Sequence, residues 1–229
     1  MNKYIKIIVK ILIYVILIIK CRALYLNPLY SLIENYYSKK IEIIGKENIP
    51  KTNGYVIISN HNFKLEIFLI QSIFKKINIV SRKSIENKFW NINKMAILYD
   101  KTKENIKESG KIVKNIILEN CKKYNKKILI FPEGSCTGVN EMFLFKKGLF
   151  YLCYENNIPI VPIILCIKKE KFVSKVFCFD EKIKVKIFKQ INSENYGDFD
   201  EYYNYIYNLM NDYLKKYIND KNTKISIMI

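Results

Sequence analysis

The residues of this sequence that are best suited to chemistry at neutral pH are His61 and Glu66. His61 is the only histidine in 229 residues, and imidazole is the side chain whose unperturbed pKa lies near neutrality, so His61 is the first candidate for a general base. If His61 lies in a turn and Glu66 in the first turn of the next helix, the carboxylate can reach one imidazole nitrogen and make the other a better base. The alternative is an isolated loop histidine beside a glutamate that only favours the helix dipole.

The segments on either side of His61 predict such a turn. Residues 55–58 form a short, apolar and largely β-branched run, which is typical of a buried strand. Residues 63–74 have apolar side chains at helical spacing. We therefore expect His61 to lie where a strand passes into a helix.

A second polar cluster follows another predicted strand, at residues 127–131. Pro132 would end the strand's hydrogen bonding, and Gly134 permits a positive φ. The following hydroxyl and main-chain N–H groups could then form a concavity that suits an anion. Because ligands of open α/β sheets bind at the carboxyl ends of the strands, we expect this cluster and His61 to share one edge of a sheet.

Four short blocks, in order, resemble motifs of the glycerophospholipid acyltransferases, the family of lysophosphatidate (1-acylglycerol-3-phosphate) acyltransferase. Asn60-His61 with Glu66 resembles the family's NHx4D motif, and residues 131–135 resemble FPEGT. Residues 96–101 resemble the block between these two motifs, and residues 158–163 resemble the closing VP motif. The resemblance covers roughly residues 41–165, and several motifs in the right order are more specific than one.

The resemblance implies transfer of a fatty acyl group from acyl-CoA or acyl-carrier protein to the free hydroxyl of 1-acylglycerol-3-phosphate, which makes phosphatidic acid. His61 would accept the proton of the attacking hydroxyl, and Glu66 would stabilise the imidazolium that forms. No covalent enzyme intermediate is required, and no cofactor or metal is expected. The implied partners are membrane lipids, the lysophospholipid or glycerol-phosphate acceptor and the acyl donor.

The same resemblance assigns Glu133 and Gly134 to acceptor binding. Main-chain N–H groups around Gly134 and Ser135 would hold the acceptor's phosphate, and Lys101 and Lys83 would add positive charge. An acidic side chain repels a phosphate, so we expect Glu133 to hold a glycerol hydroxyl or to orient a lysine instead.

The sequence departs from the family's pattern at three positions. Glu66 stands where the family has Asp, Cys136 stands where an Arg is common, and Lys101 stands where the middle block often has Arg. A lysine keeps the charge but loses bidentate phosphate geometry. Residues 131–137 and 145–148 also resemble the branch that acts on glycerol-3-phosphate or lysophosphatidylcholine, so these remain alternative acceptors.

The amino-acid composition limits which other functions are possible. The net charge of +18 indicates anionic partners, either nucleic acid or an anionic membrane surface. A basic protein that binds membrane or nucleic acid without catalysis is thus an alternative, but the lysines are scattered and no nucleic-acid motif is present, so nucleic acid is not expected. The six cysteines are widely spaced and are expected to be small buried side chains in a reducing compartment. A hydrolase that uses Cys136 or Ser135 with His61 is a further alternative, although it lacks a G-x-S-x-G motif.

The chain divides into three predicted parts. Residues 1–38 contain an apolar run at 5–19 and an aromatic amphipathic stretch at 24–37, which predict membrane-anchoring helices. Residues 39–197 form the predicted catalytic domain, and residues 198–229 a C-terminal amphipathic helix packed on it. This layout predicts a membrane-associated protein whose catalytic domain faces the cytoplasm.

The fold class expected for the domain is α/β, with a layered, mostly parallel sheet and flanking helices. Its basis is the alternation of short apolar runs with longer helical patterns. Strands are predicted at residues 39–44, 55–59, 77–80, 95–99, 128–131, 160–167, 172–179 and 182–188, and helices at 63–76, 104–124, 141–156 and after Gly197.

Overall fold

A computed structural model of the chain describes residues 41–62, 66–82, 96–99, 106–136, 141–167 and 183–226. The predicted anchoring helices within residues 1–38 and the predicted strand at 172–179 lie outside these ranges. Among the residues within them, no helix combines the length and the apolar character needed to cross a bilayer.

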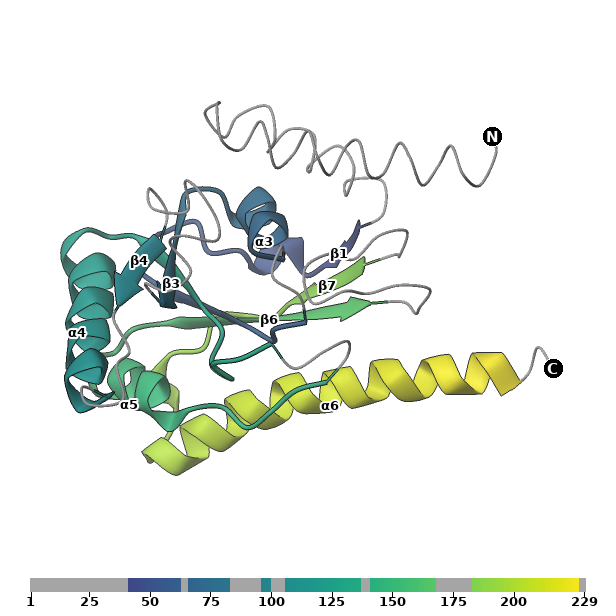
Figure 1. Cartoon of the computed structure of the whole chain (residues 1–229). Coiled ribbons are helices and arrows are strands. Elements are labelled where there is room, and N and C mark those ends of the chain that lie inside the picture. Colours follow the sequence, from purple (N-terminus) through teal and green to yellow (C-terminus); the bar gives the residue numbers. More distant parts are fainter. Residues whose placement is uncertain are drawn as a thin grey trace, which may run out of the picture.

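The centre of the structure is a seven-stranded sheet with the order β1-β7-β6-β2-β5-β3-β4 (Figure 1). Neighbouring strands are parallel except for the antiparallel pair β6 and β7, so β1 and β7 run opposite to the other five. The prediction of a layered, mostly parallel sheet is confirmed. The strands are β1 (Ile41–Ile44), β2 (Val56–Ser59), β3 (Ile77–Arg82), β4 (Ala96–Tyr99), β5 (Lys127–Ile130), β6 (Ile160–Ile167) and β7 (Ile183–Ile187).

The middle strands are buried on both faces. All four residues of β2 and all eight residues of β6 are buried, as expected for continuous apolar runs in a parallel sheet covered on both sides. Alternate β2 residues point to opposite faces, because the side-chain period of a strand is two. Val56 and Ile58 join one hydrophobic cluster, whereas Ile57 joins the other.

Helices cover both faces of the sheet. Helix α3 (Glu66–Phe74) packs on the Ile57 face, and α5 (Lys147–Glu155) and α6 (Phe199–Ser226) pack on the Val56 face (Figure 1). Helix α4 (Ile106–Leu118) contributes Ile117 to the Val56 cluster. The apolar side of α6 lies on the sheet as predicted, with Tyr202, Ile206, Met210 and Leu214 all buried.

Short helical turns join some of these elements. Two are 3-10 turns, at Lys46–Asn48 and Ser193–Asn195, and one π-helical turn at Glu119–Lys123 continues α4. The predicted helix over residues 104–124 is thus described from residue 106 to the π turn.

The helix predicted over residues 141–156 is wrong at its start, because α5 begins only at Lys147. Residues 141–146 are not helical. Two main-chain N–H groups in this stretch bind elsewhere instead: Phe143 N–H donates to Glu133 Oε2 at 2.8 Å, and Lys146 N–H donates to the Pro132 carbonyl at 3.0 Å. Tertiary hydrogen bonds therefore override the apolar spacing of this stretch.

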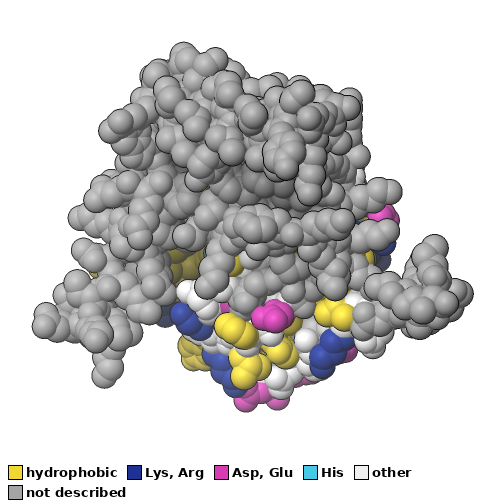
Figure 2. Space-filling view, turned by 45° about the vertical axis from the view of Figure 1, so that its right-hand side comes forward, with side chains coloured by type: hydrophobic (Ala, Val, Ile, Leu, Met, Phe, Trp, Pro, Cys, Tyr) yellow, Lys and Arg dark blue, Asp and Glu magenta, His cyan; other side chains and the backbone are white. Residues whose placement is uncertain are grey.

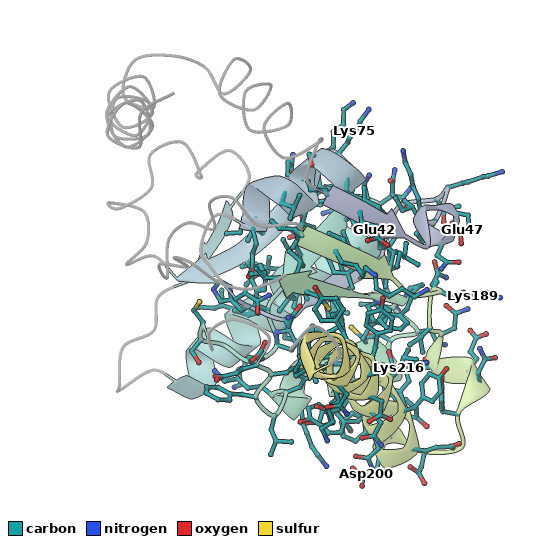
Figure 3. The ribbon with its side chains drawn as sticks, turned by 90° about the vertical axis from the view of Figure 1, so that its right-hand side faces the viewer. Glu42, Glu47, Lys75, Lys189, Asp200 and Lys216 are labelled. Atoms are coloured by element: carbon teal, nitrogen blue, oxygen red, sulfur yellow. The ribbon has the colours of Figure 1, made fainter. Side chains whose placement is uncertain are left out.

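The described surface mixes charge types. On the face shown in Figure 2, lysine, acidic and hydrophobic side chains lie among one another over the part that the structure describes. Glu47, Lys75, Lys189 and Asp200 lie at the outer edge of the molecule and come from distant parts of the chain (Figure 3). A distributed charge of this kind differs from the basic stripe that is typical of a nucleic-acid interface.

Candidate active site

The two polar clusters predicted from the sequence meet at one edge of the sheet. Strands β2 and β5 are parallel neighbours, with Ile58 opposite Ile130, so the segments that follow them emerge side by side. His61 N–H donates to Glu133 Oε1 at 2.9 Å, across 72 positions of sequence. The Cys136 thiol donates to the Asn62 carbonyl oxygen at 2.9 Å. The expectation that these two loops share one edge is confirmed.

The imidazole of His61 is held by Glu66, the first residue of α3. Glu66 Oε1 binds His61 Nδ1, and Glu66 Oε2 accepts the Asn62 N–H at 3.0 Å. The Glu66 side chain is fully buried, whereas the His61 side chain keeps 17% of its surface exposed. The predicted contact between this histidine and this carboxylate is confirmed.

This pairing selects the nitrogen that can act as a base. Because Glu66 binds Nδ1, Nε2 is the atom through which the His61 ring can take a proton. A buried carboxylate is costly unless it is hydrogen bonded, and its contacts with the ring and with the Asn62 main chain offset that cost. The Phe131 ring stacks on the imidazole, with centroids 4.2 Å apart and planes 22° apart, which limits rotation of the ring.

Glu133 has partners that the sequence did not predict. Its side chain is buried, with 5% exposed. Its two carboxylate oxygens accept the main-chain N–H groups of His61 and Phe143, at 2.9 and 2.8 Å. Glu133 thus joins the His61 loop to residues 141–146. These two hydrogen bonds give Glu133 a role in positioning the loops, in addition to its predicted contact with the acceptor.

We expect Glu133→Gln to lower kcat about 10- to 100-fold with little change in the acceptor KM, because small displacements of a catalytic group cost activity on this scale. The two main-chain N–H groups bind different carboxylate oxygens, and in glutamine one of these oxygens becomes an NH2 group, which cannot accept a hydrogen bond. Steady-state kinetics test this, with Glu47→Gln, a charge change at the outer edge of the molecule (Figure 3), as the control. An unchanged kcat with a raised acceptor KM would assign Glu133 to acceptor binding alone.

Gly134 is required by its backbone and by its neighbour. Its φ is +75°, which L side chains rarely adopt, and a Cβ there would lie 2.1 Å from Lys146 Nζ. The predicted positive φ is confirmed. The Gly134 N–H donates to the Phe131 carbonyl at 3.1 Å, so this group closes the turn, and phosphate binding by N–H groups around Gly134 and Ser135 stays a prediction. Ser135 is exposed on the same loop, and its predicted role stays a prediction.

Lys83 and Lys101, the two predicted sources of positive charge, lie outside the described residues. The structure therefore brings together His61, Glu66, Glu133, Gly134 and Ser135 from the predicted set.

Two asparagines position the His61 loop, and the sequence analysis gave neither of them a role. Asn60 exchanges a pair of hydrogen bonds with the Leu165 main chain in β6: its amide donates to the carbonyl at 3.0 Å, and its oxygen accepts the N–H at 2.9 Å. The amide of Asn62 also donates to the Leu165 carbonyl at 3.0 Å. Both side chains are buried. Polar amides directly after a buried strand were the available signal, since such groups need partners when they are buried.

Three thiols of the described residues, those of Cys121, Cys136 and Cys153, show no sign of nucleophilic activation. Burial raises the pKa of Cys121 to about 12 and the pKa of Cys153 well above its ordinary value, which keeps both thiols protonated. The Cys136 thiol donates to a main-chain carbonyl, a contact that does not produce a thiolate. Within the described ranges, no group of three or more His, Cys, Asp or Glu side chains could hold a metal ion.

Comparison with known families agrees with this geometry. A family model described as Acyltransferase matches residues 40–166, the span that contains both loops of the site. The chain is 30% identical over 164 residues to 1-acyl-sn-glycerol-3-phosphate acyltransferase of Saccharomyces cerevisiae, covering 68% of this chain and 52% of that protein. It is 24% identical over 156 residues to the human 1-acyl-sn-glycerol-3-phosphate acyltransferase alpha, covering 62% and 53%. The chain spans about half the length of these curated relatives.

A solved structure shares the fold. The crystal structure of the 1-acyl-sn-glycerophosphate (LPA) acyltransferase PlsC from Thermotoga maritima superposes with a TM-score of 0.58 at 14% identity, covering 87% of this chain and 86% of that one. At this identity the likeness concerns the arrangement of the sheet and helices.

Proposed function

Because this chain belongs to the glycerophospholipid acyltransferase family, we propose that it transfers a fatty acyl group from acyl-CoA or acyl-carrier protein to the free hydroxyl of 1-acylglycerol-3-phosphate, with phosphatidic acid as the product. The observation that carries the proposal is the His61–Glu66 pair beside the Gly134 loop. A base held by a buried carboxylate is suited to activating a hydroxyl.

The reaction follows from the roles of these two side chains. Nε2 of His61 takes the proton of the acceptor hydroxyl as its oxygen attacks the thioester carbonyl carbon. The tetrahedral intermediate then collapses, the carbon–sulfur bond breaks, and the departing thiolate takes the proton back from the imidazolium. Glu66 stabilises that imidazolium between the two steps. The acyl group passes directly to the acceptor, so His61 ends the cycle neutral.

The acceptor and the surroundings follow from the same proposal. The names of the relatives specify 1-acyl-sn-glycerol-3-phosphate as their substrate. Such a lipid lies in a bilayer, so we place the enzyme at a membrane surface, with its catalytic domain facing the cytoplasm. The net charge of +18 favours an anionic surface of this kind.

An acceptor panel tests the proposal. Purified full-length protein in detergent receives acyl-CoA with lysophosphatidate, glycerol-3-phosphate or lysophosphatidylcholine, and both free CoA and the acylated product are measured. We expect lysophosphatidate to give the highest kcat/KM and phosphatidic acid to be the product. A higher kcat/KM for either other acceptor would overturn the assignment of the acceptor, and donor consumption without any acylated product would overturn acyl transfer itself.

A further inference from the structure

We propose that Lys146 binds the phosphate of the acceptor. This inference rests on the proposed function, because it names the residue that recognises the anionic end of that substrate. Lys146 precedes α5 directly.

The position of Lys146 is set by hydrogen bonds to the Gly134 loop. Its main-chain N–H donates to the Pro132 carbonyl at 3.0 Å, and Phe143, three residues earlier, donates to Glu133. Residues 143 and 146 are thus hydrogen bonded to the loop of residues 132–134, and this loop contacts His61 through Glu133. The backbone of Lys146 is therefore tied to the same cluster as the proposed base.

The Lys146 ammonium lies against the main chain of Gly134. A Cβ built on Gly134 would lie 2.1 Å from Nζ and 2.8 Å from Cε of Lys146, so the side chain occupies the space that glycine leaves open. Lys146 as a whole is exposed, so the residue lies at the surface of the molecule next to this loop. Gly134 and Lys146 therefore depend on each other, because the absence of a side chain at Gly134 leaves room for the Lys146 ammonium.

The local chemistry calls for a cation at this place. The Gly134 N–H is used within its turn, so it does not neutralise a phosphate. A lysine ammonium binds phosphate as a point charge, and the N-terminal end of α5, which begins at the next residue, adds a partial positive charge. Glu133, the residue before Gly134, has both carboxylate oxygens hydrogen bonded to main-chain N–H groups. These bonds reduce the repulsion between Glu133 and a bound anion.

The next residue provides a matched control. Lys147 Nζ pairs with Asp200 Oδ1 at 2.7 Å and lies 5.1 Å from the centroid of the Tyr203 ring in α6. Asp200 lies at the outer edge of the molecule (Figure 3). The two adjacent lysines therefore have the same charge and neighbouring positions in the sequence, but one contacts the Gly134 loop and the other contacts α6.

The kinetic test compares Lys146→Ala with Lys147→Ala in the full-length enzyme. We expect Lys146→Ala to raise the KM for lysophosphatidate about 10- to 100-fold, the range for loss of a hydrogen bond to a charged group, and Lys146→Arg to restore most of the affinity. Lys147→Ala should leave that KM within about two-fold of the wild type, since an exposed ion pair contributes little. Equal effects of the two alanine variants would overturn the assignment.

Acyl-CoA also carries phosphates, so the donor is a second source of the same chemistry. We expect the KM for acyl-CoA to be unchanged in Lys146→Ala. A rise confined to the acyl-CoA KM would move Lys146 to the donor site and overturn its assignment to the acceptor.

A binding measurement separates this inference from the proposed function. Glycerol-3-phosphate, which has the phosphate and no acyl chain, is titrated calorimetrically into the wild type, Lys146→Ala and Lys147→Ala without a donor. We expect the wild type and Lys147→Ala to bind it and Lys146→Ala to bind it at least about ten-fold more weakly. Binding that is equal in all three proteins, or no binding to the wild type, would overturn the role of Lys146. If only the acceptor panel failed, the proposed acyl transfer would be rejected, and the phosphate binding by Lys146 measured in this titration would still stand.

Discussion

Replacing His61 by alanine is expected to lower kcat by about 10²- to 10⁴-fold, the usual contribution of a general base. The chain has no other histidine, so no second imidazole can take over the proton. The His61 side chain keeps 17% of its surface exposed, so its replacement by alanine does not leave a closed cavity inside the hydrophobic core. The variant should therefore fold, and its loss of activity should reside in the chemical step.

The measurement for His61→Ala is acceptor-dependent release of CoA, together with thermal unfolding of the purified protein. A melting temperature close to that of the wild type shows that the fold persists. Burial of Glu66 without its imidazole partner costs stability, so a fall of a few degrees is compatible with the assignment. Turnover at the wild-type rate would remove His61 from the reaction.

Replacing Glu66 by glutamine is expected to give the second largest effect, a loss of about 100-fold or more in kcat, because the orienting acid of such a pair both selects the tautomer and stabilises the imidazolium. The amide has one oxygen and one nitrogen, whereas the carboxylate serves His61 Nδ1 and the Asn62 N–H with two oxygens. The amide can keep both contacts only by donating its NH2 group to Nδ1, which leaves the proton of the ring on Nε2, where the base must be free. The charge that stabilises the imidazolium is lost in every case.

The control for Glu66→Gln is Glu119→Gln, which removes the same charge from the exposed ion pair between Glu119 and Lys123. Such pairs contribute about 0–1 kcal/mol, so Glu119→Gln should leave kcat unchanged. Glu66→Asp, which restores the charge on a shorter side chain, should recover part of the activity. Equal kcat values for the wild type and Glu66→Gln would show that the carboxylate only supports the fold.

The sheet could be predicted from the sequence because each central strand is recognisable from its own run of apolar residues. Residues 160–167 are apolar without interruption, and all eight are buried in β6. A strand that is buried on both faces needs no polar side chains, so its run of β-branched residues stands out against the helical patterns on either side. The order of the strands and the reversed direction of β1 and β7 depend on pairing between distant segments, which no local pattern records.

The pairing of His61 with Glu66 could also be predicted, because the two residues are close in sequence and the strand-to-helix turn between them is a local property. The same holds for the positive φ of Gly134, since glycine is the residue that adopts it without strain. Both features were inferred from residue types and spacing, and the structure contains both.

The start of α5 could not be predicted. The apolar spacing of residues 141–146 favours a helix, but the N–H groups of Phe143 and Lys146 bind Glu133 and Pro132. Hydrogen bonds to a loop ten or more positions away compete with the local helix, and their geometry exists only once the sheet has brought the loops together.

The sequence by itself determined the chemistry that is available to this protein: one imidazole, one acid at a spacing that a turn can close, and a glycine loop after a second buried strand. Only the tertiary structure decided which groups are already engaged and which reach the site. The Gly134 N–H closes its own turn, Glu133 joins two loops, and Lys146 lies over the glycine. Hydrogen bonds form between whichever donors and acceptors the folded chain brings within about 3 Å, and for residues 72 positions apart that distance is set by the packing of the sheet.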